Sequence, residues 1–281
     1  MNILITGASG FLGRRAAVHF SALGYEVQTP SRTQLDITDK DSVTAWFRQH
    51  QPRAVIHCAA ISDTGRCQQE PESSTRVNVT GCTNLADICR ETGAKFVFCS
   101  SDQVYHASSL PGPHSEQEFL SPETVYARQK LLAEQQCVKL CPGTVCLRLS
   151  WMYSSLSYPG EHGHLLVNLQ KALTGTSQPL SWSDRDWRGI TDVDDVVKHL
   201  PAALDLPGGV YNFGAENDMD MYRTIRSVFE ALNLSDALKR LTPNSNAAPR
   251  DIRMDGTLTA SHGIVFESTR AGLIRALQTV L

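Results

Sequence analysis

The amino-acid sequence predicts an α/β protein of the doubly wound type, in which a parallel sheet carries helices on both faces and a smaller C-terminal lobe follows. Two observations support this fold class. Short apolar runs that favour β-structure alternate with helical stretches through the first 150 residues, and such alternation produces right-handed crossovers between parallel strands. The first of these runs also leads directly into a glycine-rich turn and a helical stretch, which is how this fold class begins.

The predicted core covers residues 1–150 and the C-terminal lobe residues 151–281. The core strands are expected at Asn2–Thr6, Glu26–Thr29, Ala54–His57, Lys95–Cys99 and Thr144–Leu149. The core helices are expected at Leu12–Leu23, Asp39–Gln49, Ser73–Thr92 and Glu123–Leu140. Beyond residue 150 the pattern is looser, so this segment is expected to mix a substrate-binding lobe with elements that return to the core, without a clear linker. Its helices are expected at Asp194–Leu204, Met219–Leu232 and Ser268–Val280.

Composition and charge limit the classes of function. The 26 basic and 29 acidic residues give a net charge of −3, so a small molecule is the expected partner, and neither nucleic acid nor a membrane is. The chain enters a strand within two residues, which leaves no room for a signal peptide, and no apolar run reaches the roughly 18 residues that span a bilayer. We therefore expect a cytoplasmic protein. Its eight cysteines form no Cys-x-x-Cys pair and are expected to be buried free thiols.

No metal site is predicted. Asp192, Asp194 and Asp195 resemble a metal cluster by their spacing. Asp192, however, stands where it would cap a helix that begins near Val193, and the other two carboxylates are favourable in the first turn of such a helix.

A turn with Gly7, Gly10 and Gly13 indicates a nucleotide site. One glycine permits a positive φ angle, a second lets backbone amides approach a pyrophosphate, and a third lets the helix pack closely on the strand. The free N–H groups at the start of the helix then face the diphosphate. The position of the turn between the first strand and the first helix predicts a dinucleotide-binding (Rossmann) turn. The expected cofactor contacts here are Gly7, Ser9, Gly10, Phe11, Leu12 and Gly13.

The end of the second strand bears on the choice of nicotinamide cofactor. Folds specific for NAD often place Asp or Glu there to hold the ribose 2′-hydroxyl, whereas this chain has Ser31 and Arg32. A guanidinium pairs bidentately with a 2′-phosphate. We therefore expect NADP(H) to be preferred, with NAD(H) as the alternative. The competing interpretation of Arg32 is a solvated surface arginine.

Three side chains are candidates for the chemistry. Tyr126 and Lys130 lie one turn apart on one face of a predicted helix. A tyrosine has a pKa of about 10, and a neighbouring ammonium stabilises the phenolate and lowers that pKa toward the working pH. Ser101 lies at the carboxyl end of an apolar strand, where this fold class binds ligands, and its hydroxyl suits a substrate carbonyl. Together they predict an oxidoreductase in which Tyr126 exchanges a proton with a carbonyl oxygen.

The sequence at this point resembles the extended short-chain dehydrogenase/reductase family, and within it the dTDP-4-dehydrorhamnose reductase branch, over nearly the whole chain. The motifs that carry the resemblance are Leu35–Thr38, His57–Ala60, Ser100–Tyr105, Tyr126–Lys130, Leu147–Tyr153 and Ala248–Asp255. The resemblance implies that Asp36 and Ile37 flank the adenine. It also implies that Tyr126 and Lys130 contact the cofactor, Lys130 at the nicotinamide ribose. It also implies that the cofactor path is lined by Ala59, Ala60 and Ile61.

The resemblance leaves three functions open. The first is the reduction of a nucleotide-linked 4-keto sugar. The second is epimerisation or dehydration of a nucleotide sugar; Gln103 counts against dehydration, because it stands where related dehydratases carry Glu and an amide cannot titrate. The third is a non-catalytic binder, similar to the regulatory subunit of methionine adenosyltransferase. The chain also departs from the family pattern at Cys58, at Ala127 and at Gln129, which stands where Ser is usual.

A sugar nucleotide is the expected substrate, and four residues are expected to contact it. Asp102 and Gln103 directly follow Ser101. Arg188 and Arg250 lie in the C-terminal segment, and arginine suits a diphosphate. The competing interpretation of both arginines is a surface or interface position. The resemblance further suggests a homodimer that forms through the helix carrying Tyr126.

Overall fold

The structure is a computed structural model that describes residues 1–156, 158, 165–174 and 179–280. Contacts within the chain divide it into two compact units. The first unit comprises Met1–His106, Phe119–Leu149 and Val197–Asn212, and the second comprises Ala107–Glu118, Ser150–Val196 and Phe213–Leu281. Both units therefore draw on segments that lie far apart in the sequence.

A six-stranded sheet forms the centre of the first unit, in the order β10-β5-β4-β3-β1-β2. Its strands are β1 (Asn2–Thr6), β2 (Glu26–Gln28), β3 (Ala54–His57), β4 (Lys95–Ser101), β5 (Val145–Leu149) and β10 (Gly209–Phe213). β1 pairs in parallel with β2 and β3, and β4 pairs in parallel with β3 and β5. The apolar residues of the inner strands β1, β3, β4 and β5 are buried because both faces of the sheet are covered. The predicted doubly wound α/β fold is confirmed.

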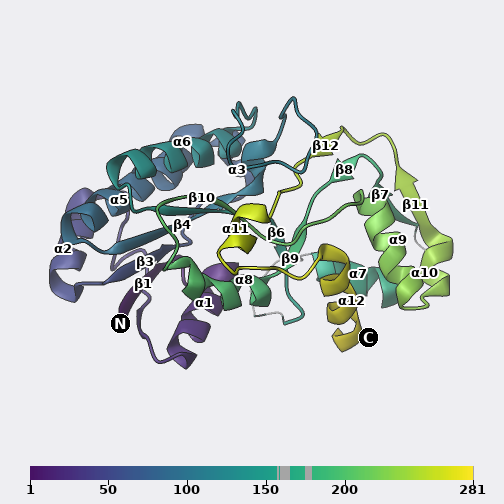
Figure 1. Ribbon diagram of the computed structural model, residues 1–281, viewed down its shortest axis with the longest axis horizontal. Helices are drawn as coiled ribbons and strands as arrows, with labels where there is room; N and C mark the ends of the chain where they lie inside the picture. The colour runs from purple at the N-terminus through teal and green to yellow at the C-terminus, as the bar shows by residue number, and fades with distance from the viewer. Residues whose placement is uncertain (157, 159–164, 175–178, 281) are drawn as a thin grey trace. The chain divides into compact units, whose positions relative to one another are not determined.

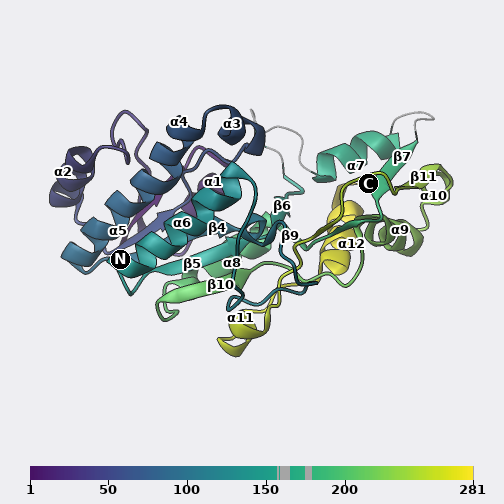
Figure 2. The same cartoon turned by 90° about the horizontal axis from the view of Figure 1, so that it is seen from above.

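Helices cover the two faces of this sheet, as Figure 1 shows. One face carries α2 (Lys40–His50), α5 (Gly81–Thr92) and α6 (Val125–Leu140), and the other carries α1 (Phe11–Ala22) and the first-unit part of α8 (Val193–Ala203). In Figure 2, α5 and α6 run side by side over the sheet. Their apolar residues pack with Leu4, Val55 and Phe96 of the strands in one hydrophobic core. This packing holds α6, the helix of Tyr126 and Lys130, against β4 and β5.

The crossover from β3 to α5 is longer than the sequence predicts. In place of one helix over Ser73–Thr92, the chain forms α3 (Thr64–Gln69), α4 (Pro71–Thr75) and a π-helical segment, η1 (Arg76–Thr80), before α5. Such π-helical segments are rare and often lie at functional sites. A second short helix, the 3₁₀ turn η2 (Asp102–Tyr105), follows β4 directly.

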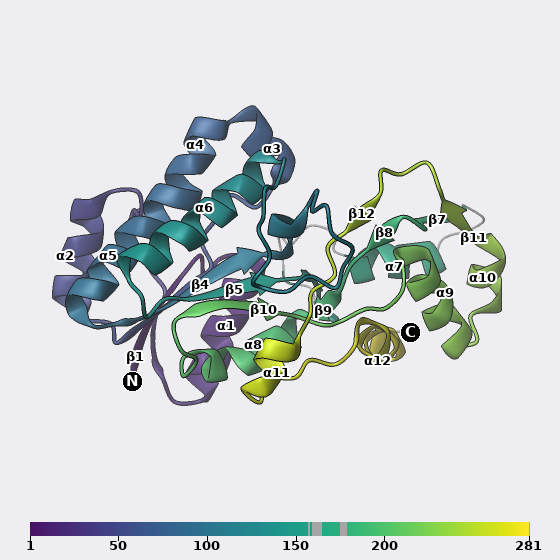
Figure 3. The ribbon, with the colours of Figure 1, turned by 45° about the horizontal axis from the view of Figure 1, so that its top comes forward.

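The second unit has its own hydrophobic core, in which Leu169, Ile225 and Leu273 are fully buried or nearly so. Its helices are α7 (Leu165–Thr174), α9 (Met221–Ala231), α10 (Ser235–Arg240), α11 (Thr257–Ser261) and α12 (Thr269–Val280). Three short pairs of parallel strands join them: β6 (Trp151–Tyr153) with β9 (Ile190–Asp192), β7 (Leu180–Ser183) with β11 (Leu241–Asn244), and β8 (Asp186–Trp187) with β12 (Arg250–Asp251). Figure 3 shows α9 beside α10, and β7 beside β11.

Two smaller predictions agree with the structure. All eight cysteines are free, and seven of them are buried while Cys58 is partly exposed. Asp192 accepts a hydrogen bond from the amide of Asp194 at 3.0 Å and so caps α8, which begins at Val193. Within the described part of the chain, no helix is long and apolar enough to cross a membrane.

Candidate functional site

The glycine turn between β1 and α1 is shaped by close backbone contacts. Gly7 has a φ of +69°, and a Cβ there would lie 2.7 Å from the amide nitrogen of Ala59. A Cβ on Gly13 would lie 2.3 Å from the carbonyl oxygen of Gly7. The turn itself is closed by a 2.9 Å hydrogen bond from the amide of Gly10 to that same carbonyl. Only glycine fits at Gly7 and Gly13, for conformational and steric reasons respectively.

A cavity of about 730 Å³ opens beside this turn in the first unit. Its walls come from the β1–α1 turn, the segment after β2, the segment after β3, and the first residues of the crossover. Ten of the residues predicted to contact the cofactor line it: Gly7, Ser9, Gly10, Ser31, Arg32, Asp36, Ile37, Ala59, Ala60 and Ile61. The other five do not line it: Phe11, Leu12, Gly13, Tyr126 and Lys130.

Eleven further residues, which the sequence did not indicate, also line the cavity. Most of them are adjacent in the chain to residues that were predicted to contact the cofactor, so the sequence motifs indicated the segments in which they lie. Arg66 of α3 and Val77 of η1 have no such signal, because only the folding of the crossover brings them to the cavity. The additional lining residues are Thr6, Ala8, Arg14, Thr29, Pro30, Gln34, Leu35, Thr38, Cys58, Arg66 and Val77.

The charges around the cavity are mostly positive. Arg14, Arg32 and Arg66 line it, against the single carboxylate of Asp36. The hydroxyl and the amide of Thr38 donate hydrogen bonds to Asp36 at 2.8 and 2.9 Å. These two bonds lower the pKa of Asp36, and the nearby Arg32 lowers it further. The carboxylate is therefore ionised at neutral pH, and a net positive lining remains.

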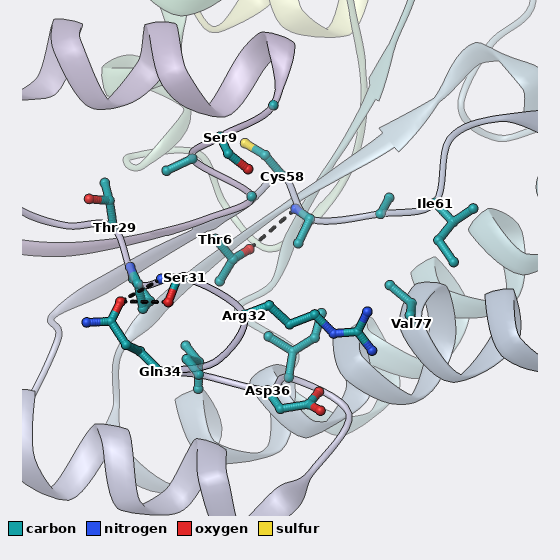
Figure 4. A pocket seen from close by; sticks show the side chains of 18 of the residues that line it. Thr6, Ser9, Thr29, Ser31, Arg32, Gln34, Asp36, Cys58, Ile61 and Val77 are labelled. Atoms are coloured by element: carbon teal, nitrogen blue, oxygen red, sulfur yellow. Dashed lines mark hydrogen bonds between the residues drawn. The ribbon is translucent and has the colours of Figure 1, made fainter. Parts of the chain in front are cut away.

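The segment after β2 forms a turn along one side of the cavity, as Figure 4 shows. Gln34 closes this turn, because its side-chain oxygen accepts hydrogen bonds from the amide and the hydroxyl of Ser31 at 2.8 and 2.9 Å. The exposed side chain of Arg32 extends from the turn toward Val77, with Asp36 beside it. Arg32 is thus a surface residue that also forms part of the cavity wall.

The helix α6 presents Tyr126 and Lys130 toward the end of β4. Thr124 caps this helix by accepting a hydrogen bond from the amide of Ala127 at 3.3 Å. Tyr126 and Lys130 are both buried, and the Lys130 Nζ lies 5.8 Å from the centre of the Tyr126 ring. The same Nζ donates a 2.8 Å hydrogen bond to the carbonyl oxygen of Cys99. Lys130 therefore lies beside the Tyr126 ring and is fixed to the strand that carries Ser101.

The end of β4 is also next to the wall of the cavity. Cys58, which directly follows β3 and lines the cavity, has its sulfur atom 3.7 Å from that of Cys99 on β4. Ser101 is the last residue of β4. Its hydroxyl contacts Asp102 Oδ1 at 3.3 Å and accepts a hydrogen bond from the amide of Gln103 at 3.2 Å. The cavity wall after β3 thus lies beside β4, the strand that ends at Ser101 and to which Lys130 is bonded.

A buried network of hydrogen bonds, which the sequence did not indicate, begins at Ser100, the residue before Ser101. Glu134 on α6 accepts hydrogen bonds from the hydroxyl of Ser100 and from the guanidinium of Arg148, the latter at 2.8–3.2 Å. Arg148 also donates to the hydroxyl of Tyr105 at 2.8 Å, and Tyr105 donates to Asn212 at 2.7 Å. Burial opposes the charge of Arg148, but Glu134 outweighs it and raises the pKa of the guanidinium. The network joins α6, β4, β5, η2 and β10.

The two arginines predicted to contact the substrate belong to the second unit. Arg250 forms a bidentate ion pair with Asp186, at 2.8 and 2.6 Å. Arg188 is buried, and its guanidinium lies 5.2 Å from the centre of the Trp151 ring. Arg250 therefore already has a carboxylate partner within its own unit, whereas Arg188 packs against an aromatic ring.

Comparisons with known proteins place these features in a family. Residues 1–280 match the family model described as RmlD substrate binding domain. The chain belongs to this family. The chain is similar to dTDP-4-keto-6-deoxy-D-glucose reductase of Streptomyces niveus, with 28% identity over 253 residues, or 89% of this chain and 85% of the relative. The predicted membership of the sugar-nucleotide reductase branch is thereby confirmed.

Two further matches are a protein named as a subunit of another enzyme and a solved structure. The chain is 24% identical over 277 residues to methionine adenosyltransferase 2 subunit beta of Rattus norvegicus, which is 93% of this chain and 82% of that protein. The crystal structure of dTDP-4-dehydrorhamnose reductase from Bacillus anthracis in complex with NADP superposes with a TM-score of 0.84 at 22% identity, over 100% of this chain and 99% of the other. At that identity the superposition supports the fold.

Proposed function

We propose that the protein is an NAD(P)H-dependent reductase of a nucleotide-linked 4-keto sugar. The observation that carries the proposal is membership of the RmlD family over residues 1–280, since relatives in this comparison are named as reductases of dTDP-linked keto sugars. The first unit adds a cavity beside a glycine turn and, on α6, a buried Tyr126–Lys130 pair that a hydrogen bond from Lys130 ties to β4. Reduction of a carbonyl needs both parts, a site for a hydride donor and a group that gives a proton.

The cavity has the features that a dinucleotide requires. The residue before α1 is Gly10, so no side chain caps the first N–H groups of this helix. A helix start of this kind attracts a diphosphate through those N–H groups. The positive lining complements the charge of the phosphates. We propose that the ten predicted residues of the cavity wall contact the cofactor, and that Phe11, Leu12 and Gly13 support them by starting α1.

Tyr126 is the proposed proton donor. A bound nicotinamide supplies the hydride that reduces the carbonyl carbon. The Tyr126 hydroxyl gives its proton to the carbonyl oxygen, which becomes the alcohol, and the Lys130 ammonium stabilises the phenolate that remains. Ser101 donates a hydrogen bond to the same oxygen. Asp102 and Gln103 flank that position, and the side-chain amide of Gln103 does not titrate and so cannot act as an acid or base, which disfavours a dehydratase.

Oxidation of NADPH in the presence of a dTDP-4-keto-6-deoxy sugar tests the proposed reaction. We expect turnover with the wild-type protein and its loss in Tyr126→Phe, which keeps the ring but lacks the proton. Cofactor binding should survive in that variant. Absence of turnover in the wild type with every such sugar, despite tight NADPH binding, would refute the reductase.

A non-catalytic role is the second candidate, because the chain matches methionine adenosyltransferase 2 subunit beta over 93% of its length. In that case the protein would bind a dinucleotide and act through a partner protein. Stable co-purification of one enzyme, together with the failed turnover described above, would support it.

We propose further that NADP(H) is preferred, through contacts of its 2′-phosphate with Ser31 and Arg32. A hydrogen bond to a charged group contributes about 1.5–3 kcal/mol, which is roughly 10- to 100-fold in Kd. Arg32→Ala should weaken NADPH by that factor and leave NADH nearly unchanged. Arg66→Ala is the matched comparison, because Arg66 lines the same cavity but contacts Glu70 at 3.4 Å. Equal Kd values for both cofactors in wild type and Arg32→Ala would refute this preference.

A further inference from the structure

The side chain of Gln129 is buried within the first unit and lies between Tyr126 and Lys130 in the sequence of α6. Its Nε2 donates hydrogen bonds to the hydroxyls of Ser74 and Thr75 at 2.8 and 3.0 Å and approaches the carbonyl oxygen of Pro71 at 3.3 Å. The Ser74 hydroxyl donates its own proton to the carbonyl oxygen of Glu70, and the Thr75 hydroxyl donates its proton to that of Pro71. They can therefore only accept from Gln129, which fixes the orientation of its amide.

The oxygen of Gln129 connects this contact to a second buried amide. Asn78, in the π-helical segment η1, donates a 2.9 Å hydrogen bond to Gln129 Oε1. The same Asn78 donates to the carbonyl oxygen of Ile61 at 3.0 Å and accepts from the amide of Ile61 at 2.8 Å. Asn78 thus pairs with both backbone groups of one residue, as a neighbouring strand would.

Ile61 is part of the wall of the cavity, in the segment after β3 where no strand neighbour holds the backbone. A continuous line of buried hydrogen bonds therefore runs from α6 through Asn78 to this wall. Every donor and acceptor of the two amides has a partner, and a fully satisfied buried network has one defined geometry. These hydrogen bonds are not a consequence of local sequence, because Gln129 lies 51 residues from Asn78 and Asn78 lies 17 residues from Ile61.

We propose that Gln129 is a positioning residue, which acts through Asn78 to hold Ile61 and the cavity wall in register with the helix of Tyr126 and Lys130. The proposal rests on the proposed use of this cavity for the nicotinamide cofactor. Gln129 touches neither reacting atoms nor the cavity itself. Its effect is to keep the cofactor wall and the proton donor at a fixed separation, which hydride transfer requires.

Hydrogen exchange at the amide of Ile61 in the ligand-free protein tests the structural half of the proposal. That amide donates to Asn78, whose own position depends on Gln129. In Gln129→Leu, which keeps the volume but removes the amide, we expect exchange at Ile61 to accelerate about tenfold or more. In Val145→Ala, which removes buried apolar volume from β5, we expect the amide of Ile61 to keep its wild-type protection relative to neighbouring amides. Unchanged protection of Ile61 in Gln129→Leu would overturn the proposal.

A double-mutant cycle on NADPH affinity tests the functional half. Gln129→Leu and Asn78→Ala are each expected to raise the Kd about tenfold. If Gln129 acts through Asn78, the double variant binds about as weakly as Asn78→Ala alone; independent roles would multiply to roughly a hundredfold. We also expect the KM for NADPH to rise more than kcat falls, because Lys130 still bonds to Cys99 in these variants. Multiplicative effects, or a Kd that Val145→Ala raises equally, would overturn the proposal.

The two measurements separate this proposal from the proposed function. If the wild-type protein binds no nicotinamide cofactor, the proposed function fails, and exchange at Ile61 still decides whether Gln129 holds the wall. Should Gln129→Leu not fold, Gln129→Met replaces it, since its thioether keeps the length of the side chain and removes both the carbonyl acceptor for Asn78 and the donors to Ser74 and Thr75. We expect the same acceleration of exchange at Ile61 from that variant, and its absence there would again overturn the proposal.

Discussion

Replacement of Glu134 by Gln should destabilise the protein far more than a surface charge change does. Glu134 and Arg148 have side chains that are only 2% and 4% exposed, and they share contacts of 2.8–3.2 Å. An exposed pair contributes little because water screens both charges. A buried pair that loses one charge leaves the other without compensation, which costs about 3–5 kcal/mol. Proteins have a total stability of about 5–15 kcal/mol, so this loss is a large fraction of it.

Urea denaturation of the wild type, Glu134→Gln and a double variant with Arg148→Met measures this cost. The double variant removes both charges, so no buried charge is left without compensation. We therefore expect it to regain most of the lost stability. Glu230→Gln is the control, because the Arg226–Glu230 pair on α9 is more than half exposed on both sides. If Glu134→Gln shifts the midpoint no more than Glu230→Gln, or if the double variant is the least stable of all, the reasoning is wrong.

Three further perturbations follow from the geometry. Gly13→Ala places a methyl group 2.3 Å from the Gly7 carbonyl, so the turn must open, and the Kd for NADPH should rise at least about tenfold while Ala16→Gly in the same helix leaves it nearly unchanged. Burial, with a smaller contribution from Lys130, lowers the pKa of His57 to about 3; the unfolded chain therefore binds the extra proton as pH falls below about 6.5, and stability should drop by up to about 1.4 kcal/mol per pH unit. Urea unfolding at about pH 6 and 4 should show that slope in wild type and not in His57→Phe; equal slopes would contradict a neutral imidazole. Thr124→Ala removes the cap of α6 and should cost about 1 kcal/mol in the same assay, and no loss would mean that the cap is not formed in solution.

The sequence predicts those parts of the protein whose cause is local. The bounds of β1 and β3 agree with the structure to the residue, because short apolar runs between turns favour buried parallel strands. The strict steric need at Gly7 and Gly13 is visible in the spacing of the turn. Tyr126 and Lys130 meet because residues four apart share a helix face. Each of these features depends on residues that are near one another in the chain.

Only the tertiary structure decides which distant residues become partners. No pattern within α3 or η1 indicates that Arg66 or Val77 line the cavity. Arg250 pairs with Asp186, 64 residues away, which the sequence could not distinguish from a free guanidinium. The link from Gln129 through Asn78 to Ile61 is likewise made by three separate elements. A buried polar group needs a hydrogen-bond partner, but the sequence does not show which residue that partner is. The tertiary structure determines which donors and acceptors lie close enough.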